Sequence, residues 1–344
     1  MGLNAVAAFG PGRVNLIGEH TDYNDGLCLP FAIAQGVTVR ASALGGARVE
    51  AFADDLDEDD AFDAAAPPRD AAGWRAFVRG TVGELHAAGW TVGGARVRIA
   101  GDLPRGSGLS SSAALSTALV LALIALANED EGDRRALARL CSRVENDWVG
   151  AQTGLLDQLA ALFGREGHAL RLDCRDLAID LVPLDLRGWT LAVAPSGHEH
   201  VHAGSGYNER RAECRAAAEA LGIATLRDAP EDAPDRLPAP LDRRVRHVLT
   251  ENARVDAAVT ALRAGDLPTL AALLDASHAS LRDDYEVSVD AVERTVARLK
   301  GAGAAGARIV GGGFGGSVLA LFPPGAAPPA DATVVEPAGP ARVL

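Results

Sequence analysis

The sequence predicts an α+β protein of two domains, and three observations support this fold class. Its 344 residues exceed the usual size of a single hydrophobic core. Segments of alternating polarity, which favour strands, and segments of helical periodicity occur in both halves of the chain. A new strand pattern at 191–194 marks the beginning of a second unit, and we therefore predict domains of residues 1–186 and 187–344.

The first predicted domain combines strands with buried helices. Its strand patterns lie at 37–40, 49–52, 95–100, 168–172 and 177–184. The apolar run 113–127 predicts a buried helix, because it is shorter than the ~20 residues that span a bilayer. The acidic, proline-containing segment 53–70 is expected to form a solvated loop. A helical pattern begins at Arg134, breaks at Gly150 and Gly154, and then resumes.

The second predicted domain is mainly helical. Its helical patterns cover 208–221, 243–264, 267–281 and 289–301. Two strands, 307–310 and 317–322, are expected to form a hairpin bent around the glycine-rich segment between them. The tail that follows is rich in proline and alanine, so we expect it to pack loosely.

Charge and composition exclude several functions. The net charge of -13 and the pI near 5.1 argue against a nucleic-acid or anionic-membrane partner, since either partner needs a basic surface. Lys300 is the single lysine, which excludes a phosphate loop of the Gly-Lys-Ser/Thr type. The N-terminus lacks the pattern of a signal peptide. The four cysteines have neither disulfide nor zinc spacing, so we expect reduced thiols in a cytoplasmic protein.

The segment LPRGSGLSSSAAL, at 103–115, is the first of two glycine-rich candidate phosphate loops. A turn that contains Gly106 and Gly108 leads into three serines and then into the apolar helix. This order places unpaired N–H groups and the positive end of a helix dipole at one spot, which favours a phosphate cradle. The alternative is a flexible loop capped by serines. A nucleophilic serine is disfavoured, because Ser107 lies directly between the two glycines rather than in a Gly-x-Ser-x-Gly motif.

The segment VGGGFGG, at 310–316, is the second glycine-rich candidate loop. Five glycines in seven residues exceed what a tight turn needs, and glycine lets the backbone approach a ligand closely. A simple hairpin turn remains the alternative. Together with 103–115, this segment predicts two backbone walls around one phosphate-bearing molecule.

Six stretches in order carry a resemblance to a known family. They are GRVNLIGEHTDYNDG, LPRGSGLSSSAAL, GLLDQLAALFG, GYNERRAEC, SHASLRDDYEVS and ARIVGGGFGG. Three of them resemble the motifs of the GHMP small-molecule kinases, and the first is similar to the galactokinase signature. The resemblance implies an N-terminal domain like ribosomal protein S5 domain 2, a ferredoxin-like C-terminal domain, and an active site between them. It also implies ATP, Mg²⁺ and galactose as partners, with galactose 1-phosphate as the product.

The resemblance also implies roles for individual residues. Asp157 matches the catalytic aspartate, which Arg13 accompanies. The positions that match sugar contacts are Glu19, His20, Asp22, Gly154 and Tyr207. The positions that match the ATP loop are Gly106, Ser107, Gly108, Leu109, Ser110, Ser111, Ser112 and Ala113. Ser112 and Glu145 match the pair that holds Mg²⁺, for which oxygen ligands are suited. If Asp157 opens a helix, the helix dipole and Arg13 both favour its ionised form.

Two departures from the family pattern and two other functions stay open. Ile309 and Val310 stand where many relatives have Met-Thr, and Gly206 stands where many have Glu. A kinase of N-acetylgalactosamine or arabinose, or a catalytically silent sensor of sugar and ATP, would use the same fold. The HEHVH segment at 198–202 resembles a zinc or nickel site, but we interpret it as a loop because no fourth ligand is nearby. The chain is expected to act as a monomer.

Overall fold

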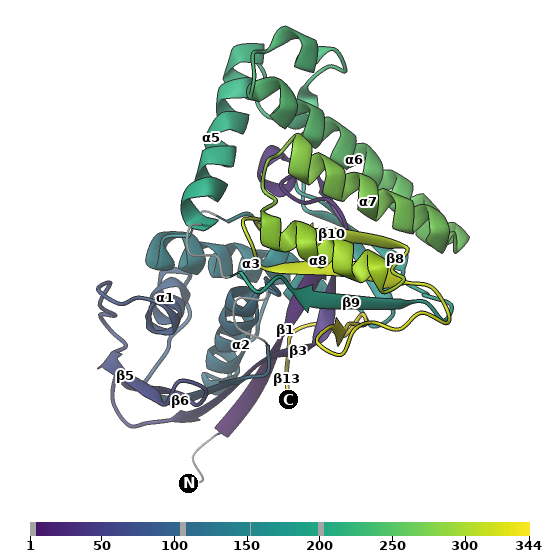
Figure 1. The fold of residues 1–344 in the computed structure, drawn as a ribbon. Helices are drawn as coiled ribbons and strands as arrows, with labels where there is room; N and C mark the ends of the chain where they lie inside the picture. Colours follow the sequence, from purple (N-terminus) through teal and green to yellow (C-terminus); the bar gives the residue numbers. More distant parts are fainter. Residues whose placement is uncertain (1–4, 104–107, 152, 199–202) are drawn as a thin grey trace.

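The computed structural model describes residues 5–103, 108–151, 153–198 and 203–344, and Figure 1 shows their arrangement. Three sheets organise the described chain. The six-stranded sheet has the order β13-β1-β3-β6-β4-β5. Its strands are β1 (Ala5–Asn15), β3 (Pro30–Ala43), β4 (Arg48–Ala53), β5 (Glu58–Asp63), β6 (Ala95–Gly101) and β13 (Arg342–Val343). Its neighbours are antiparallel except for β4 and β6, which run parallel.

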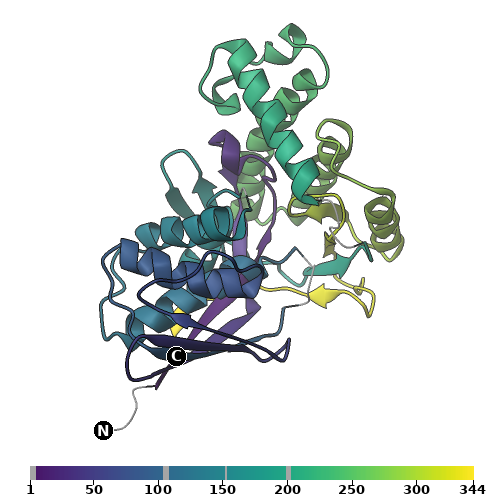
Figure 2. The same cartoon turned by 90° about the vertical axis from the view of Figure 1, so that its left-hand side faces the viewer.

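Four helices lie on one face of this sheet (Figures 1 and 2). They are α1 (Trp74–Ala87), α2 (Ser111–Leu126), α3 (Arg134–Arg143) and α4 (Leu156–Phe163). Helices α2 and α4 contact the strands of the sheet, and α1 and α3 pack on these two helices. Helix α2 contacts β1 and β3 and is apolar around its whole circumference, which is typical of a helix buried on all sides. A π-helical turn, Val144–Val149, continues α3 directly.

The remaining strands form two smaller sheets. One has the order β10-β11-β9-β12, and the other has the order β2-β7-β8. Their bounds are β2 (Leu27–Cys28), β7 (His168–Asp173), β8 (Ala178–Pro183), β9 (Thr190–Pro195), β10 (Gly306–Val310), β11 (Ser317–Phe322) and β12 (Thr333–Val334). The helices beside them are α5 (Ala203–Leu221), α6 (Leu241–Ala264), α7 (Leu267–Asp283) and α8 (Asp290–Gly301). Helices α7 and α8 pack on β10, and α6 bridges to the small β2-β7-β8 sheet (Figure 1).

The hydrophobic core crosses the predicted domain boundary. One buried cluster joins Val14, Leu16 and Phe31 of the first unit to Val255 and Leu319 of the second. Strand β13, at the C-terminus, pairs with β1, so the end of the chain lies beside the N-terminal sheet (Figures 1 and 2). The boundary at 186/187 stays a prediction. The structure adds that the C-terminal strand β13 returns to the sheet of the first unit.

The α+β fold class and most expected elements are confirmed. The four helices of the second half, the helix after the serine loop and the hairpin around GGGFGG all form within a few residues of the predicted bounds. The expected loop at 53–70 was wrong in part, because residues 58–63 form β5. Phe62 is buried there while its neighbours are exposed, which is the alternation of a strand. The tail is also better packed than expected, since Val335 and Ala341 are buried.

Candidate active site

The predicted sugar contacts Glu19, His20 and Asp22 lie in the loop that follows β1, which ends at Asn15, and we call this loop the sugar loop. A buried carboxylate fixes this loop, because the Gly18 N–H donates to Glu251 Oε1 at 2.9 Å. Ser277 and Arg254 also donate to Glu251. Burial opposes ionisation of Glu251, but the nearby positive charges, of which Arg254 is the largest, and the Ser277 hydrogen bond together outweigh it and hold the pKa at about 2. The loop is therefore attached to α6 and α7 through one buried anion.

Asp157 lies in the first turn of α4, as the sequence predicted, and both of its oxygens have donors. Arg13 Nε donates to Oδ1 at 2.7 Å across 144 residues of sequence, and the Ser110 hydroxyl donates to Oδ2. Arg13 Nη1 also donates to the Gly108 carbonyl at 2.6 Å. Burial would lower the pKa of Arg13, but the charges of Asp157 and Glu19 raise it above its ordinary value. Arg13 thus links the predicted catalytic carboxylate to the phosphate loop.

Asp22 and Gly154 lie against each other beside this cluster. A Cβ atom added at Gly154 would come within 2.0 Å of Asp22 Oδ2, so any larger residue there would displace the Asp22 carboxylate. Burial and the negative charge of Asp157 raise the pKa of Asp22 to about 6. Two predicted sugar contacts and the predicted base therefore share one small volume.

Helix α2 begins at Ser111, so its positive end faces the described end of the first glycine loop. The N–H groups of Ser111, Ser112 and Ala113 belong to the first turn, which offers them no acceptor within the helix. Gly108 and Leu109 precede it, and Ser110 has a positive φ of 57°. Gly106 and Ser107 lie outside the described residues. The described part fits an anion site at a helix N-terminus.

Glu145 lies on the π-helical turn and is 6% exposed. Gln158 Nε2 donates to Glu145 Oε2 at 2.6 Å, and the Ser112 side chain lies near enough to lower the pKa of Glu145 in part. Burial and the charge of Asp157 raise the pKa of Glu145 above its ordinary value. A divalent cation would relieve this crowding of negative charge, and the carboxylate and hydroxyl oxygens suit Mg²⁺. The residues present therefore fit the predicted metal.

Glu19 connects the sugar loop to the second glycine loop. The Gly311 N–H donates to Glu19 Oε1 at 2.9 Å, and Arg308 Nη2 lies 3.3 Å from the same oxygen. Arg308 is fully buried on β10, where its Nη1 also donates to the carbonyls of Asn15 and Leu16. One oxygen of the predicted sugar contact is thus already used by the protein.

His20 lies within a cluster made by all three tyrosines of the chain. Its ring centroid is 4.7 Å from that of Tyr285, 5.4 Å from that of Tyr207 and 5.9 Å from that of Tyr23. Burial, reinforced by the positive charges of His247 and Arg210, lowers the pKa of His20 to about 3. His20 is therefore neutral at physiological pH.

Each of the three motifs holds at least one non-glycine residue in the left-handed region of backbone space. These residues are His20 with a φ of 62° and Asp25 with 56° in the first motif, Ser110 with 57° in the second and Phe314 with 60° in the third. Such residues cost free energy and tend to occur where the surroundings over-determine the backbone, as in ligand sites. The Phe314 ring also explains one departure from the family pattern. A Cβ atom at Gly206 would lie 2.5 Å from that ring, so glycine leaves room for it.

Sequence reasoning missed the residues that hold the motifs in place. Arg308, Gln158 and Tyr285 each contact a predicted site residue, and Glu251 holds Gly18 beside Glu19, yet none of the four was singled out as a site residue. Arg308 and Tyr285 lie inside quoted motifs, and Gln158 directly follows Asp157. A polar residue inside an apolar strand, as at Arg308, is the signal that could have found it.

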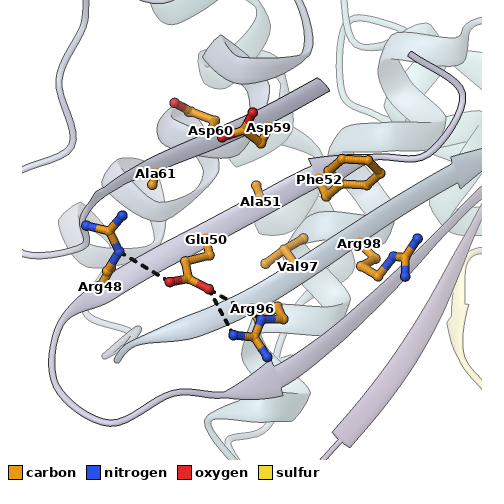
Figure 3. A pocket seen from close by; sticks show the side chains of 10 residues that line it. All are labelled: Arg48, Glu50, Ala51, Phe52, Asp59, Asp60, Ala61, Arg96, Val97 and Arg98. Atoms are coloured by element: carbon orange, nitrogen blue, oxygen red, sulfur yellow. Dashed lines mark hydrogen bonds and ion pairs between the residues drawn. The ribbon is translucent and has the colours of Figure 1, made fainter. Parts of the chain in front are cut away.

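Two other features are the HEHVH segment, of which the His198 carbonyl accepts from the Gly316 N–H of the second glycine loop, and a surface hollow. Only His198 of that segment is described, and the described residues hold no group of three or more His, Cys, Asp or Glu side chains placed for a metal. The hollow has a volume of about 500 Å³ and lies on the six-stranded sheet. Figure 3 shows its lining side chains, among which Arg48 and Arg96 donate to Glu50. The hollow contains none of the predicted site residues.

Three family descriptions match the sequence in order. The galactokinase galactose-binding signature covers residues 2–43. The GHMP kinase N-terminal domain covers 76–165, and the GHMP kinase C-terminal domain covers 258–335. The matched regions contain the sugar loop, Asp157 and the second glycine loop.

Curated relatives match over most of their length. A galactokinase from a Roseiflexus species is 44% identical over 90% of this chain and 82% of its own. A galactokinase from Mycobacterium tuberculosis is 43% identical over 91% of this chain and 88% of its own. The fold and these matches place the protein among the GHMP kinases. Within that class, the chain belongs to the galactokinase family.

Solved structures agree with this placement. A Lactococcus lactis galactokinase complexed with galactose has a TM-score of 0.91 at 33% identity, and the match covers 99% of this chain and 95% of that one. A mevalonate kinase has a TM-score of 0.66 at 16% identity, which shows a shared fold. Across the described ranges, no helix is both long and apolar enough to cross a membrane.

Proposed function

We propose that the protein transfers the γ-phosphoryl group of ATP to the C1 hydroxyl of galactose, which gives galactose 1-phosphate. One observation carries this proposal. Asp157, paired with Arg13 and Ser110, stands between the sugar loop and the start of α2. A carboxylate between a hydroxyl-binding loop and an anion-binding helix end suits phosphoryl transfer from a nucleotide to a sugar.

In this proposal Asp157 accepts the proton of the C1 hydroxyl. Arg13 and Ser110 orient its two oxygens, so that the carboxylate does not reorganise during the reaction. Arg13 also donates to the Gly108 carbonyl, so one side chain fixes the position of Asp157 relative to the phosphate loop. A base within hydrogen-bond reach of the attacking hydroxyl contributes typically about 10²- to 10⁴-fold to the rate.

The sugar would be read by groups around Asp157. We assign O3 and O4 to Asp22 and Tyr207, with the backbone of Gly154 beside Asp22. Glu19 and His20 are assigned to the O6 region, where Glu19 Oε1 already binds Gly311 and Arg308 and Oε2 is assigned to a sugar hydroxyl. An equatorial O4, as in glucose, would leave a buried acceptor unpaired, which costs several powers of ten in specificity.

The nucleotide would lie at the start of α2. In this proposal, the N–H groups of the loop 106–113 and the α2 dipole hold the phosphates. Mg²⁺ would be held by Glu145 and Ser112, directly or through water, and would neutralise charge on the transferring phosphoryl group. Gln158 fixes the orientation of the Glu145 carboxylate.

The proposal includes the setting in which the enzyme works. The four cysteines are free, and free thiols persist in a reducing compartment such as the cytoplasm. We propose a cytoplasmic monomer that takes galactose and Mg-ATP as its partners. Size measurement in solution, with and without Mg-ATP, tests the monomer.

A phosphorylation screen over six sugars tests the function. The panel is galactose, glucose, talose, 2-deoxygalactose, arabinose and N-acetylgalactosamine, each with ATP and Mg²⁺. We expect galactose to have the highest kcat/KM and glucose to be lower by several powers of ten. Preference for arabinose or N-acetylgalactosamine would mean that this sugar, and not galactose, is the substrate. Ligand binding without any turnover would mean that the protein is a catalytically silent sensor. Equal turnover of glucose and galactose would overturn the pocket assignment.

A further inference from the structure

A chain of hydrogen bonds leads away from His20 through two tyrosines to a cysteine. His20 Nδ1 and the Tyr23 hydroxyl are 2.8 Å apart, and the Tyr23 and Tyr285 hydroxyls are also 2.8 Å apart. The Tyr285 hydroxyl lies 3.0 Å from Cys214 Sγ. Tyr285 and Cys214 are buried, at 0% and 3% exposure, so the described contacts largely replace water as their partners.

The bonds of this chain must all run in one direction. A tyrosine hydroxyl has one hydrogen, so a hydroxyl that donates to one neighbour accepts from the other. If Tyr23 donates to His20, then Tyr285 donates to Tyr23 and Cys214 donates to Tyr285. In the opposite direction, His20 Nδ1–H is the first donor and the cysteine sulfur is the last acceptor.

The chemistry of the two ends favours the direction from Cys214 to His20. An imidazole nitrogen is a strong acceptor and a thiol sulfur is a weak one. The chain therefore ends better with Tyr23 donating to His20 Nδ1 than with Tyr285 donating to the sulfur. The Asn24 amide donates to the His20 carbonyl at 2.9 Å and so holds the backbone beside the ring.

The other ring nitrogen of His20 has no partner in the described part of the chain. His20 Nε2 is buried and without a hydrogen bond there, while the residue is 4% exposed. A buried polar atom without a partner is costly, and at a predicted sugar contact it indicates the place of a ligand atom. Which proton this atom carries decides what it can bind.

We propose that Cys214, Tyr285 and Tyr23 are positioning residues that hold His20 as the Nε2–H tautomer, so that it donates a hydrogen bond to the sugar. This inference rests on the proposed function for the identity of the ligand. One sugar hydroxyl then makes two hydrogen bonds, as a donor to the Glu19 carboxylate and as an acceptor from His20. The hydroxyl gives its hydrogen to Glu19 Oε2 and receives one from His20 Nε2.

Long-range ¹H–¹⁵N NMR on protein with ¹⁵N-labelled histidine tests the tautomer directly. His20→Gln removes one set of signals from the spectrum and so assigns His20 among the eight histidines. In the sugar-free protein we expect protonated Nε2 and bare Nδ1. A protonated Nδ1 would overturn the proposal. This measurement needs no turnover, so a failed galactose assay with the expected tautomer would refute the proposed function and leave the inference standing.

Variants of the chain test its direction. Tyr23→Phe should give a mixture of tautomers and raise the KM for galactose about three- to tenfold with little change in kcat, as loss of one hydrogen bond predicts. Cys214→Ala should give a smaller shift of the same kind, and Cys214→Ser, which keeps a donor, should restore the single tautomer. Cys141→Ala, which removes an equally buried thiol elsewhere, is the matched control. A single Nε2–H tautomer in both Tyr23→Phe and Cys214→Ala would overturn the proposal.

Discussion

The two sides of the predicted sugar pocket differ in how their polar groups are held. Asp157, Arg13 and Ser110 on one side form a charged cluster, joined by an ion pair of 2.7 Å. His20, Tyr23 and Tyr285 on the other side form a neutral cluster joined by hydroxyl hydrogen bonds. The pKa of His20 is about 3 and burial raises the pKa of Tyr23 and Tyr285 well above 10, so these three side chains carry no charge near pH 7.

The difference separates chemistry from recognition. A charged cluster can accept a proton and offset charge that develops on a phosphoryl group. A neutral cluster of fixed donors and acceptors discriminates between hydroxyls while changing little during the reaction. Substitutions on the charged side should therefore lower kcat, and substitutions on the neutral side should raise KM.

Replacing the predicted base should have the largest effect. Asp157→Asn keeps the shape of the side chain and loses its ability to accept a proton, so kcat should fall by about 10³-fold. Galactose should still bind, because the neutral side is unchanged. Turnover assays together with calorimetric titration of galactose measure both quantities. Near-normal turnover in this variant would contradict the site assignment.

Replacing Glu145 or Ser112, the predicted Mg²⁺ ligands, should have the next largest effect. Glu145→Ala should lower kcat/KM for Mg-ATP about 10- to 100-fold, because its carboxylate would hold the cation against the phosphates. Ser112→Ala should act in the same direction to a smaller extent. Galactose affinity should hardly change in either variant. The matched control is Glu50→Ala, which removes a carboxylate from the hollow on the six-stranded sheet, away from the predicted site. Unchanged Mg²⁺ dependence in both variants would exclude this pair.

Arg13 tests how Asp157 acts. Arg13→Gln removes the cation that favours the ionised carboxylate, so the acid side of the kcat–pH profile should move to higher pH if Asp157 is a base. If Asp157 only positions the hydroxyl, kcat should fall and the profile should stay in place. Arg96→Gln, on the six-stranded sheet, controls for loss of one positive charge. Profiles measured at saturating substrates separate the two mechanisms.

Asp22 and His20 should differ in how galactose affinity depends on pH. The pKa of Asp22 is raised to about 6, so the acceptor form dominates above pH 6 and is lost as the pH falls through that value. Affinity should drop about tenfold for each unit below pH 6. His20 ionises only near pH 3 and should add no dependence above pH 5. Calorimetry from pH 5 to 8 should therefore show one acid limb, which Asp22→Asn abolishes. A limb that persists in that variant would contradict the Asp22 assignment.

The sequence by itself determined the fold class, most helices and the motifs of the site. Apolar periodicity reports which face of an element is buried, and glycine clusters report close backbone approach, so both can be read locally. The α2 helix and the hairpin around GGGFGG formed as predicted for this reason. Six ordered motifs were enough for the family.

Only the tertiary structure decided which groups support those motifs. Arg13 and Asp157 are 144 residues apart, Glu19 and Arg308 meet between β1 and β10, and Tyr285 reaches Tyr23 across 262 residues. The π-helical turn that carries Glu145 has the same sequence periodicity as α3, so the sequence could not distinguish the two. Contacts of this kind depend on how elements pack in three dimensions, and local periodicity contains no information about the partner an element will meet. The charge state of His20 follows from the same cause, since burial among distant side chains sets it.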